Sequence, residues 1–332
     1  MRLQTVALLA LGALAMTIIT GTSESRAAQS TYEELVGLFS EWRTFEQPPL
    51  RDGAPDYTAE SLARKHTQLK SFQARLAAID SRNWPIAQQA DYHVLRAEMN
   101  GLDFSIRVLK PWQRDPAFYT SIWTAQSDTP AHEGPTHHAL VELWTYEFPL
   151  SDAAEAKLTA ELLTIPPLLT QARVNLTGNA RDLWVAGTGT IKQQVADLAA
   201  LEQKTAKNGA ELKRAIQAAH QATADFVEWL ERQAPSKTGP SGIGVENYTW
   251  SLRNVHLVPL SWEEEVAILK RELARAHAGL RLEEHRNRGL PPMSVISSPE
   301  EYERRANQAV TKYIAFLKGR HVMPMRDYMD PA

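Results

Sequence analysis

Apolar residues recur every three or four positions over most of this chain, which is the spacing of one face of an α-helix. No segment shows the alternation of a strand or the signal of a hairpin. We therefore predict an all-α protein. The apolar rows consist of Leu95, Met99, Leu102, Ile106 and Leu109; Leu212, Ile216, Ala219, Phe226 and Leu230; Val266, Leu269, Leu273, Ala276 and Leu280; and Tyr302, Ala306, Ala309, Tyr313 and Phe316.

Three predicted helices begin with a capping box, in which a hydroxyl and a glutamate three residues later satisfy free backbone N–H groups. These boxes are Thr31–Glu34, Ser261–Glu264 and Ser298–Glu301. Two loops, at about 110–136 and 234–244, are rich in proline and glycine and are surrounded by aromatic residues. The pattern predicts a multi-helix, bundle-like array with long aromatic-rich loops, and a looser helical portion at about 31–110.

The first 27 residues are typical of a secretory signal peptide. A basic residue, Arg2, precedes a short apolar run, and Ser25-Arg26-Ala27 fits the small-x-small cleavage rule. We expect residues 28–332 to be exported to the bacterial periplasm or beyond, with an uncleaved anchor as the alternative and no further membrane association. A net charge of −3 shows no footprint of nucleic-acid binding. The absence of cysteine excludes disulfides, thiolate ligands and a lipid-modified cysteine.

The stretch HEGPTHH, residues 132–138, looks like the start of a zinc site. A zincin helix places two histidines four residues apart on one face, with a glutamate beside the first as general base. Here His132 and His137 are five residues apart, and Gly134-Pro135 interrupts any helix between them. His132, Glu133 and His137 therefore remain weak metal candidates, and we predict a structural loop.

Two other groups of residues have both a functional and a structural interpretation. Glu246, Tyr248 and Arg253 follow a glycine-rich loop, so they could bind a substrate, with Tyr248 orienting a carbonyl and Arg253 a carboxylate. The alternative is a short helix that packs its aromatic residues into the core. His277 and Glu284 share one helix face and could contribute to a metal site, but charged neighbours also favour a solvated face.

Beyond these patterns, three long runs resemble the bacterial domain-of-unknown-function family 885 (DUF885). They begin at DPAFYTSIW, GVENYTWSLRN and VTKYIAFLKGR, and the similarity extends over the mature chain. The resemblance implies a mostly helical, exported protein similar to zinc-dependent peptidases of the gluzincin type. Members of the family carry His-Glu, two residues, then Pro-Gly-His-His, downstream of the part matched here. HEGPTHH is one residue shorter and has Thr136 where glycine is expected.

The resemblance thus implies that the chain is the N-terminal portion of a peptidase-like protein. We expect it to shape a cleft for a peptide-like substrate, to be inactive alone and to hold no cofactor itself. Zinc is expected in the complete protein. The apolar residues of GRHVMPMRDYMDPA predict packing against a missing C-terminal catalytic portion, without which the fold is incomplete. The alternative is a non-catalytic periplasmic helical module for binding or scaffolding.

Overall fold

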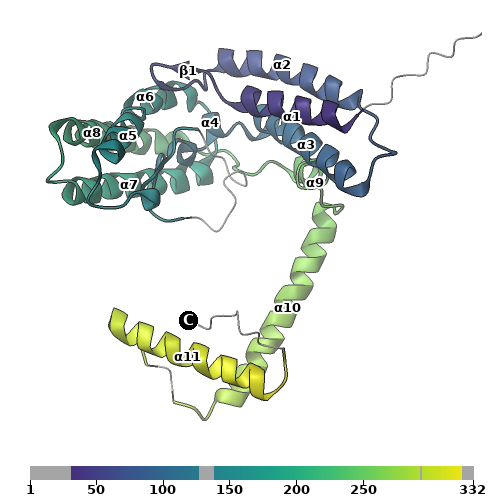
Figure 1. The fold of residues 1–332 in the computed structure, drawn as a ribbon, viewed down its shortest axis with the longest axis vertical. Coiled ribbons are helices and arrows are strands. Elements are labelled where there is room, and N and C mark those ends of the chain that lie inside the picture. Colours follow the sequence, from purple (N-terminus) through teal and green to yellow (C-terminus); the bar gives the residue numbers. More distant parts are fainter. Residues whose placement is uncertain (1–30, 127–137, 292–293, 324–332) are drawn as a thin grey trace, which may run out of the picture. The chain divides into compact units, whose positions relative to one another are not determined.

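A computed structural model describes residues 31–126, 138–291 and 294–323 of the 332-residue chain. The chain divides between Trp262 and Glu263 into two compact units, and each is described here by itself. The helices of the first unit are α1 (Tyr32–Glu46), α2 (Ala59–Ala77), α3 (Ile86–Phe104), α4 (Pro111–Arg114), α5 (Asp152–Leu162), α6 (Ile165–Asn175), α7 (Arg181–Lys204), α8 (Ala210–Gln233) and α9 (Val245–Asn254) (Figure 1). The second unit contains α10 (Trp262–Asn287), apart from its first residue, and α11 (Pro299–Gly319).

The prediction of an all-α protein is confirmed for the described residues. Short helical turns supplement the main helices, at Ser105–Leu109, Pro116–Tyr119, Leu143–Thr145 and Ala234–Ser236. Part of the first predicted loop is therefore helical, because Pro111 and Pro116 occupy the first turns of short helices, where proline has no backbone donor to lose.

We found no hairpin signal in the sequence, but the described residues contain a short hairpin. Strands β1 (Leu50–Arg51) and β2 (Ala54–Pro55) pair antiparallel around Asp52 and Gly53, which have φ angles of 53° and 83°. Such a two-residue turn requires positive φ, which glycine and aspartate tolerate. The signal was the Asp-Gly pair itself, since two-residue strands are too short to alternate. A second minimal pair, β3 (Ile122–Trp123) with β4 (Val141–Glu142), is parallel.

Helices α1, α2 and α3 enclose their own hydrophobic cluster. The capping box at Thr31 is confirmed, because Glu34 N–H donates to the Thr31 hydroxyl and Thr31 N–H donates to the Glu34 carboxylate. Trp42 is buried in this cluster and donates its indole N–H to Glu98 at 2.9 Å. This cluster lies within residues 31–110, and the looser packing expected of that portion stays a prediction. The buried members of the cluster are Leu35, Leu38, Trp42, Leu69, Leu76, Trp84, Leu95 and Met99.

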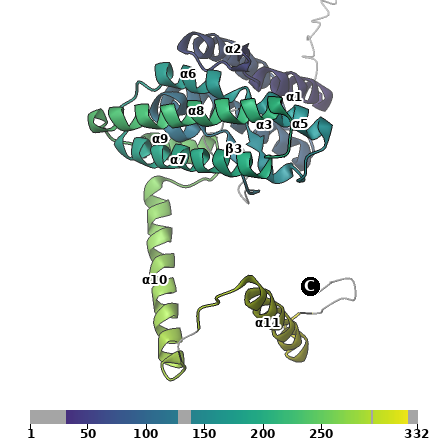
Figure 2. The same ribbon diagram turned by 90° about the vertical axis from the view of Figure 1, so that its left-hand side faces the viewer.

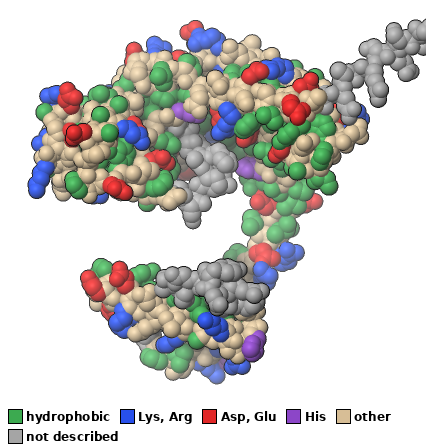
Figure 3. Space-filling view, in the orientation of Figure 1, with side chains coloured by type: hydrophobic (Ala, Val, Ile, Leu, Met, Phe, Trp, Pro, Cys, Tyr) green, Lys and Arg blue, Asp and Glu red, His purple; other side chains and the backbone are tan. Residues whose placement is uncertain are grey.

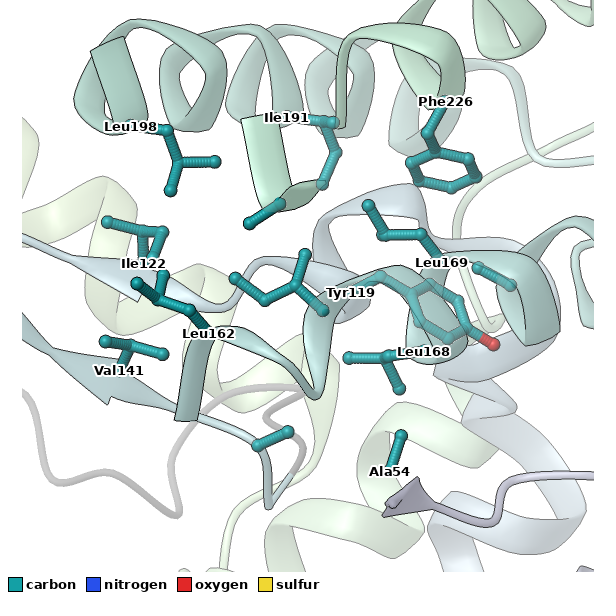
Figure 4. Packing of buried hydrophobic residues seen from close by; sticks show 14 of the residues in the cluster. Ala54, Tyr119, Ile122, Val141, Leu162, Leu168, Leu169, Ile191, Leu198 and Phe226 are labelled. Atoms are coloured by element: carbon teal, nitrogen blue, oxygen red, sulfur yellow. The ribbon is translucent and has the colours of Figure 1, made fainter. Parts of the chain in front are cut away.

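The largest core of the first unit lies among α5, α6, α7 and α8. Helices α7 and α8 run side by side along their length (Figures 1 and 2). Their side chains converge with those of α5, α6 and the short strands in a hydrophobic interior (Figure 4). Buried Gln194 of α7 accepts hydrogen bonds from the backbone of Ser121 and Ile122, at 2.6 and 3.1 Å, and so ties β3 to the helices.

The segment 234–244 is closely held, although its sequence looks like a linker. The Arg114 guanidinium donates to the carbonyls of Pro240, Ser241 and Gly242. The Ser241 hydroxyl accepts from the first two N–H groups beyond Arg181, at the start of α7. Lys237 lies over the Trp184 ring at 4.1 Å and donates to the Gly178 carbonyl.

Many large apolar side chains on the helices of the second unit are exposed. No side chain of α10, which lies wholly within the described residues, is buried. Leu269, Leu273 and Leu280 are each more than half exposed, at 59%, 57% and 56%. On α11, Tyr302, Tyr313 and Phe316 are also exposed, while Leu317 is buried. Among the described residues, no helix is long and apolar enough to cross a membrane. The predicted signal peptide, residues 1–27, lies outside the described residues.

Candidate functional site

A cavity of about 280 Å³ opens on the first unit, where three distant segments meet. One wall comes from residues 47–55, the turn after α1 and the β1–β2 hairpin. The second comes from residues 138–140, and the third from the junction of α5 and α6, where Glu161 and Thr164 lie. A cavity with both apolar and polar walls is the usual form of a small-ligand site.

Buried polar contacts fix the second wall. The His138 backbone N–H donates to the Tyr57 hydroxyl at 3.0 Å. Tyr57 in turn donates its N–H to Gln171 at 2.6 Å, and its carbonyl accepts from the Asn175 side chain at 3.1 Å. Gln171 and Asn175 are one turn apart on α6. Because these amides belong to a packed helix, they hold the backbone at His138 in place relative to α6.

Positive charge gathers beside His138. Burial lowers the pKa of its imidazole, and the charges of Lys65 and Arg43 lower it further. Burial also lowers the pKa of Lys65 to about 8, against the opposing effect of Glu46. The Lys65 ammonium donates to the Glu46 carbonyl and lies 5.4 Å from the centre of the Phe45 ring. Neither Lys65 nor Arg43 lines the cavity, and Arg43 is paired with Glu46 at 2.8 Å.

Glu161 of α5 is among the residues that line the cavity. The Glu161 carboxylate accepts a hydrogen bond from the Tyr146 hydroxyl at 2.6 Å, and Lys157 Nζ lies 3.6 Å away. Burial and this carboxylate together raise the pKa of the Tyr146 phenol, so it remains a donor. Over the face drawn in Figure 3, acidic and basic side chains are interspersed rather than separated by sign.

The weak metal candidates of the sequence lie outside the described residues, so their loop is not tested. His132, Glu133 and His137 belong to the gap at 127–137. Within the parts of the chain that the structure describes, no three His, Cys, Asp or Glu side chains gather as metal ligands. Zinc requires three or four such ligands. The described residues therefore do not fit the zinc site that the family resemblance implies.

The candidate substrate residues lie on α9, on two different sides of the helix. Glu246 and Arg253 are exposed and seven positions apart, so they share a face, whereas Tyr248 is half-buried and points away from it. Arg253 donates to the Leu260 carbonyl at 3.3 Å. None of the three lines the cavity described above. Their role in binding a substrate stays a prediction.

Helix α9 is fixed to α3 by a stacked aromatic pair. The rings of Trp250 and Phe104 are nearly parallel, with centres 5.4 Å apart, and the Arg107 guanidinium covers Trp250. Arg107 also pairs with Asp103, which contacts His66 at 3.0 Å. Burial alone would raise the pKa of Asp103, but these hydrogen bonds lower it. Trp250 thus has the structural role, packing an aromatic side chain of this short helix, that the sequence analysis gave as the alternative.

Comparison with known proteins identifies the family. Residues 37–290 match the family described as "Bacterial protein of unknown function (DUF885)", which covers most of the chain. The chain belongs to this family. The DUF885 chain is also similar in fold to a solved structure described as a "putative lipoprotein of unknown function" from Shewanella oneidensis, with a TM-score of 0.55 and 14% identity. No curated protein matches it.

This DUF885 chain spans little more than half of its solved neighbour. The alignment covers 89% of the chain but 57% of the Shewanella oneidensis protein. At 14% identity the likeness establishes the fold alone. The whole neighbour therefore contains structure that has no counterpart in the aligned residues.

Proposed function

We propose that this DUF885 chain is the helical N-terminal part of an exported, zinc-dependent peptidase-like protein and forms walls of its substrate cleft. The observation that carries this proposal is the uncovered apolar row on α10, where Leu269, Leu273 and Leu280 are each more than half exposed. Burying one such leucine contributes about 1.5–3 kcal/mol. Rows of this kind are normally covered by other protein.

The greater length of the solved neighbour supports the same interpretation. If the aligned residues are 57% of that chain, the remainder is large enough to cover an exposed helical face. Its description as a putative lipoprotein supports export, since lipoproteins are exported proteins, and agrees with the signal peptide expected at residues 1–27. Among the described residues no three potential metal ligands gather, so the proposal assigns these residues substrate shaping and leaves metal binding to the remaining part of the protein.

The first test is the nucleotide sequence beyond the codon for Ala332. The proposal expects the reading frame to continue into His-Glu, two residues and Pro-Gly-His-His. The longer protein should hold one zinc after dialysis and hydrolyse peptides, whereas residues 28–332 alone should not. Stoichiometric zinc and peptidase activity in residues 28–332, lost in His132→Ala, would show that HEGPTHH is the metal site.

A second test uses the exposed row directly. Purified residues 28–332 should bind a hydrophobic dye and self-associate, because apolar patches of this kind promote association. Replacing Leu269, Leu273 and Leu280 by serine should reduce both effects, while Arg271→Gln with Arg275→Gln on the same helix should not. A monomeric wild-type chain without dye binding contradicts the proposal.

The second candidate function is a non-catalytic periplasmic binding module. The cavity near His138 favours it, because all of its described lining residues belong to the first unit and, among the described residues, no three potential metal ligands gather. The discriminating result is a longer protein without zinc or peptidase activity that still binds a small ligand.

A further inference from the structure

The turn between α7 and α8 contains an Asn-Gly pair, the dipeptide in which asparagine deamidates most readily. The chain has two such pairs, Asn208-Gly209 in this turn and Asn100-Gly101 within α3. We propose that the Glu155 carboxylate protects Asn208-Gly209 from spontaneous deamidation in the folded protein. This proposal concerns a modification site in the first unit and is independent of the function proposed above.

Deamidation at this pair is a reaction between the Gly209 backbone nitrogen and the Asn208 side chain. The nitrogen loses its proton to water or hydroxide and forms a bond to Asn208 Cγ. The bond from Cγ to Nδ2 breaks, and Nδ2 takes up a proton and leaves as ammonia. Water then opens the cyclic imide, which leaves aspartate or isoaspartate at position 208. Glycine permits this attack because it has no Cβ that hinders the approach.

Glu155 of α5 binds both nitrogens that take part in this reaction. Its Oε2 accepts a hydrogen bond from Asn208 Nδ2 at 2.7 Å, and its Oε1 accepts one from the Gly209 backbone N–H at 2.8 Å. Hydrogen bonds to an ionised carboxylate are stronger than those between neutral groups. The carboxylate also opposes loss of the Gly209 proton, because a second negative charge would then lie beside the first. Attack on Asn208 therefore requires both contacts to break first.

The two partners of this contact belong to packed parts of the first unit. The Asn208 N–H donates to the carbonyl of Thr205 at 2.9 Å, and Thr205 is fully buried. On the other side, α5 buries Leu158 in the same hydrophobic core as Leu212 of α8. Because both sides are held by buried residues, the contact of Glu155 with the turn persists while the first unit is folded.

The same carboxylate explains why glycine occupies position 209. A Cβ there would lie 2.6 Å from Glu155 Oε1, so a larger residue would displace the carboxylate. The close approach therefore requires glycine after Asn208 and also suppresses the reaction that glycine allows. Deamidation would end this arrangement, because aspartate or isoaspartate has no side-chain donor and its charge would face that of Glu155.

The second Asn-Gly pair serves as a reference in the same chain. Asn100 and Gly101 lie inside α3, where the backbone N–H groups are bonded within the helix, and Asn100 Nδ2 donates to the Asn254 carbonyl at 3.0 Å. None of these contacts involves Glu155. Deamidation of Asn100 therefore reports unfolding of the first unit, whereas deamidation of Asn208 also reports loss of the Glu155 contact.

The test is incubation of purified residues 28–332 at mildly alkaline pH, followed by peptide mapping of both Asn-Gly pairs by mass spectrometry. In the folded wild-type chain, Asn208 should deamidate at least about tenfold more slowly than in the same chain unfolded in urea. Glu155→Gln removes the charge and one acceptor oxygen. It should accelerate deamidation of Asn208 about tenfold, the effect of losing one charge-assisted hydrogen bond, and leave Asn100 unchanged.

Glu202→Gln is the matched control. The Glu202 carboxylate accepts from Gln217 and so joins α7 to α8 without contacting the Asn-Gly pair, and its replacement should leave the rate at Asn208 unchanged. The proposal is overturned if Glu155→Gln leaves that rate unchanged, if it accelerates both Asn-Gly pairs equally, or if Glu202→Gln has the same effect. It is also overturned if wild-type Asn208 deamidates equally fast folded and unfolded, a comparison that needs no variant to fold. Zinc content and peptidase activity of the longer protein decide the proposed function separately.

Discussion

Helices α8 and α10 have nearly the same length, 24 and 26 residues, and carry apolar rows of the same period, yet their surroundings differ completely. In α8, Leu212, Ile216, Phe226 and Leu230 are fully buried. No residue of α10 is buried by the described parts of the chain. The comparison teaches that periodicity predicts which face of a helix is apolar. Whether that face is buried depends on which other elements pack against it, and the sequence of the helix itself does not show this.

Equal truncations on the two helices should give the largest difference. Leu230→Ala removes a fully buried side chain from α8, so we expect a loss of about 2–5 kcal/mol in the free energy of unfolding. Leu273→Ala, at a position 57% exposed, should change stability by less than about 0.5 kcal/mol. Urea unfolding followed by circular dichroism measures both. Similar losses would mean that α10 is covered in solution by the chain itself.

Replacing one glycine by alanine on each kind of helix should change stability in opposite directions, with a loss on the covered helix and a gain on the uncovered one. A Cβ on Gly187 of α7 would lie 2.6 Å from the Ala117 backbone nitrogen, whereas one on Gly279 of α10 meets no described atom within 4 Å. Gly187→Ala should therefore destabilise the protein by about 1–3 kcal/mol. Gly279→Ala should stabilise α10 by up to about 1 kcal/mol, through helix propensity. Stabilisation by Gly187→Ala would contradict the close packing of α7.

Removing the buried charge of Lys65 in the first unit should have a smaller effect on the free energy of unfolding, and this effect should depend on pH. The folded pKa of Lys65 is about 8, below the unfolded value of about 10.4. Between these two pKa values the unfolded chain binds more protons than the folded chain, so the free energy of unfolding rises with pH in this window. Below about pH 8 the destabilisation caused by burying the charged lysine is fully present. Lys65→Met should be more favourable at pH 7 than at pH 10, by about 1–2 kcal/mol. Lys70→Met, exposed on the same helix, is the control, and an equal pH dependence would rule out burial as the cause.

The smallest effect is expected for surface ion pairs of the second unit. Arg281 and Glu284 lie 3.3 Å apart on α10, and both side chains are more than half exposed. Glu284→Gln should change the unfolding free energy by less than about 0.5 kcal/mol, and still less at high salt. A larger change, insensitive to salt, would place this face of α10 against other protein.

Much of the fold follows from sequence because its signals are local. The cap at Thr31, the cap at Ser298 and the bounds of α10 were predictable from hydroxyl, glutamate and apolar spacing. The hairpin was missed because its whole signal is Asp52-Gly53. The π-helical turn at Ser105–Leu109 likewise has no local marker that distinguishes it from the end of α3.

The candidate site was far less predictable, because its walls meet only in the folded chain. They come from residues 47–55, residues 138–140 and the α5–α6 junction, and no spacing between these segments carries information. His138 was noticed only as part of HEGPTHH. Nothing local distinguishes Glu161 from other glutamates, because its significance comes from the Tyr146 hydroxyl and the cavity beside it.

The binding of segment 234–244 to its neighbours has a practical consequence for enzymatic digestion. Its sequence suggests an easily cut linker, and Lys237 is its sole tryptic site. Yet the lysine ammonium is held between the Trp184 ring and the Gly178 carbonyl, and Arg114 holds the carbonyls that follow. A protease binds an extended stretch of backbone in its active site, so this segment must first detach from its neighbours. Trypsin should therefore spare the bond after Lys237 until the first unit itself unfolds.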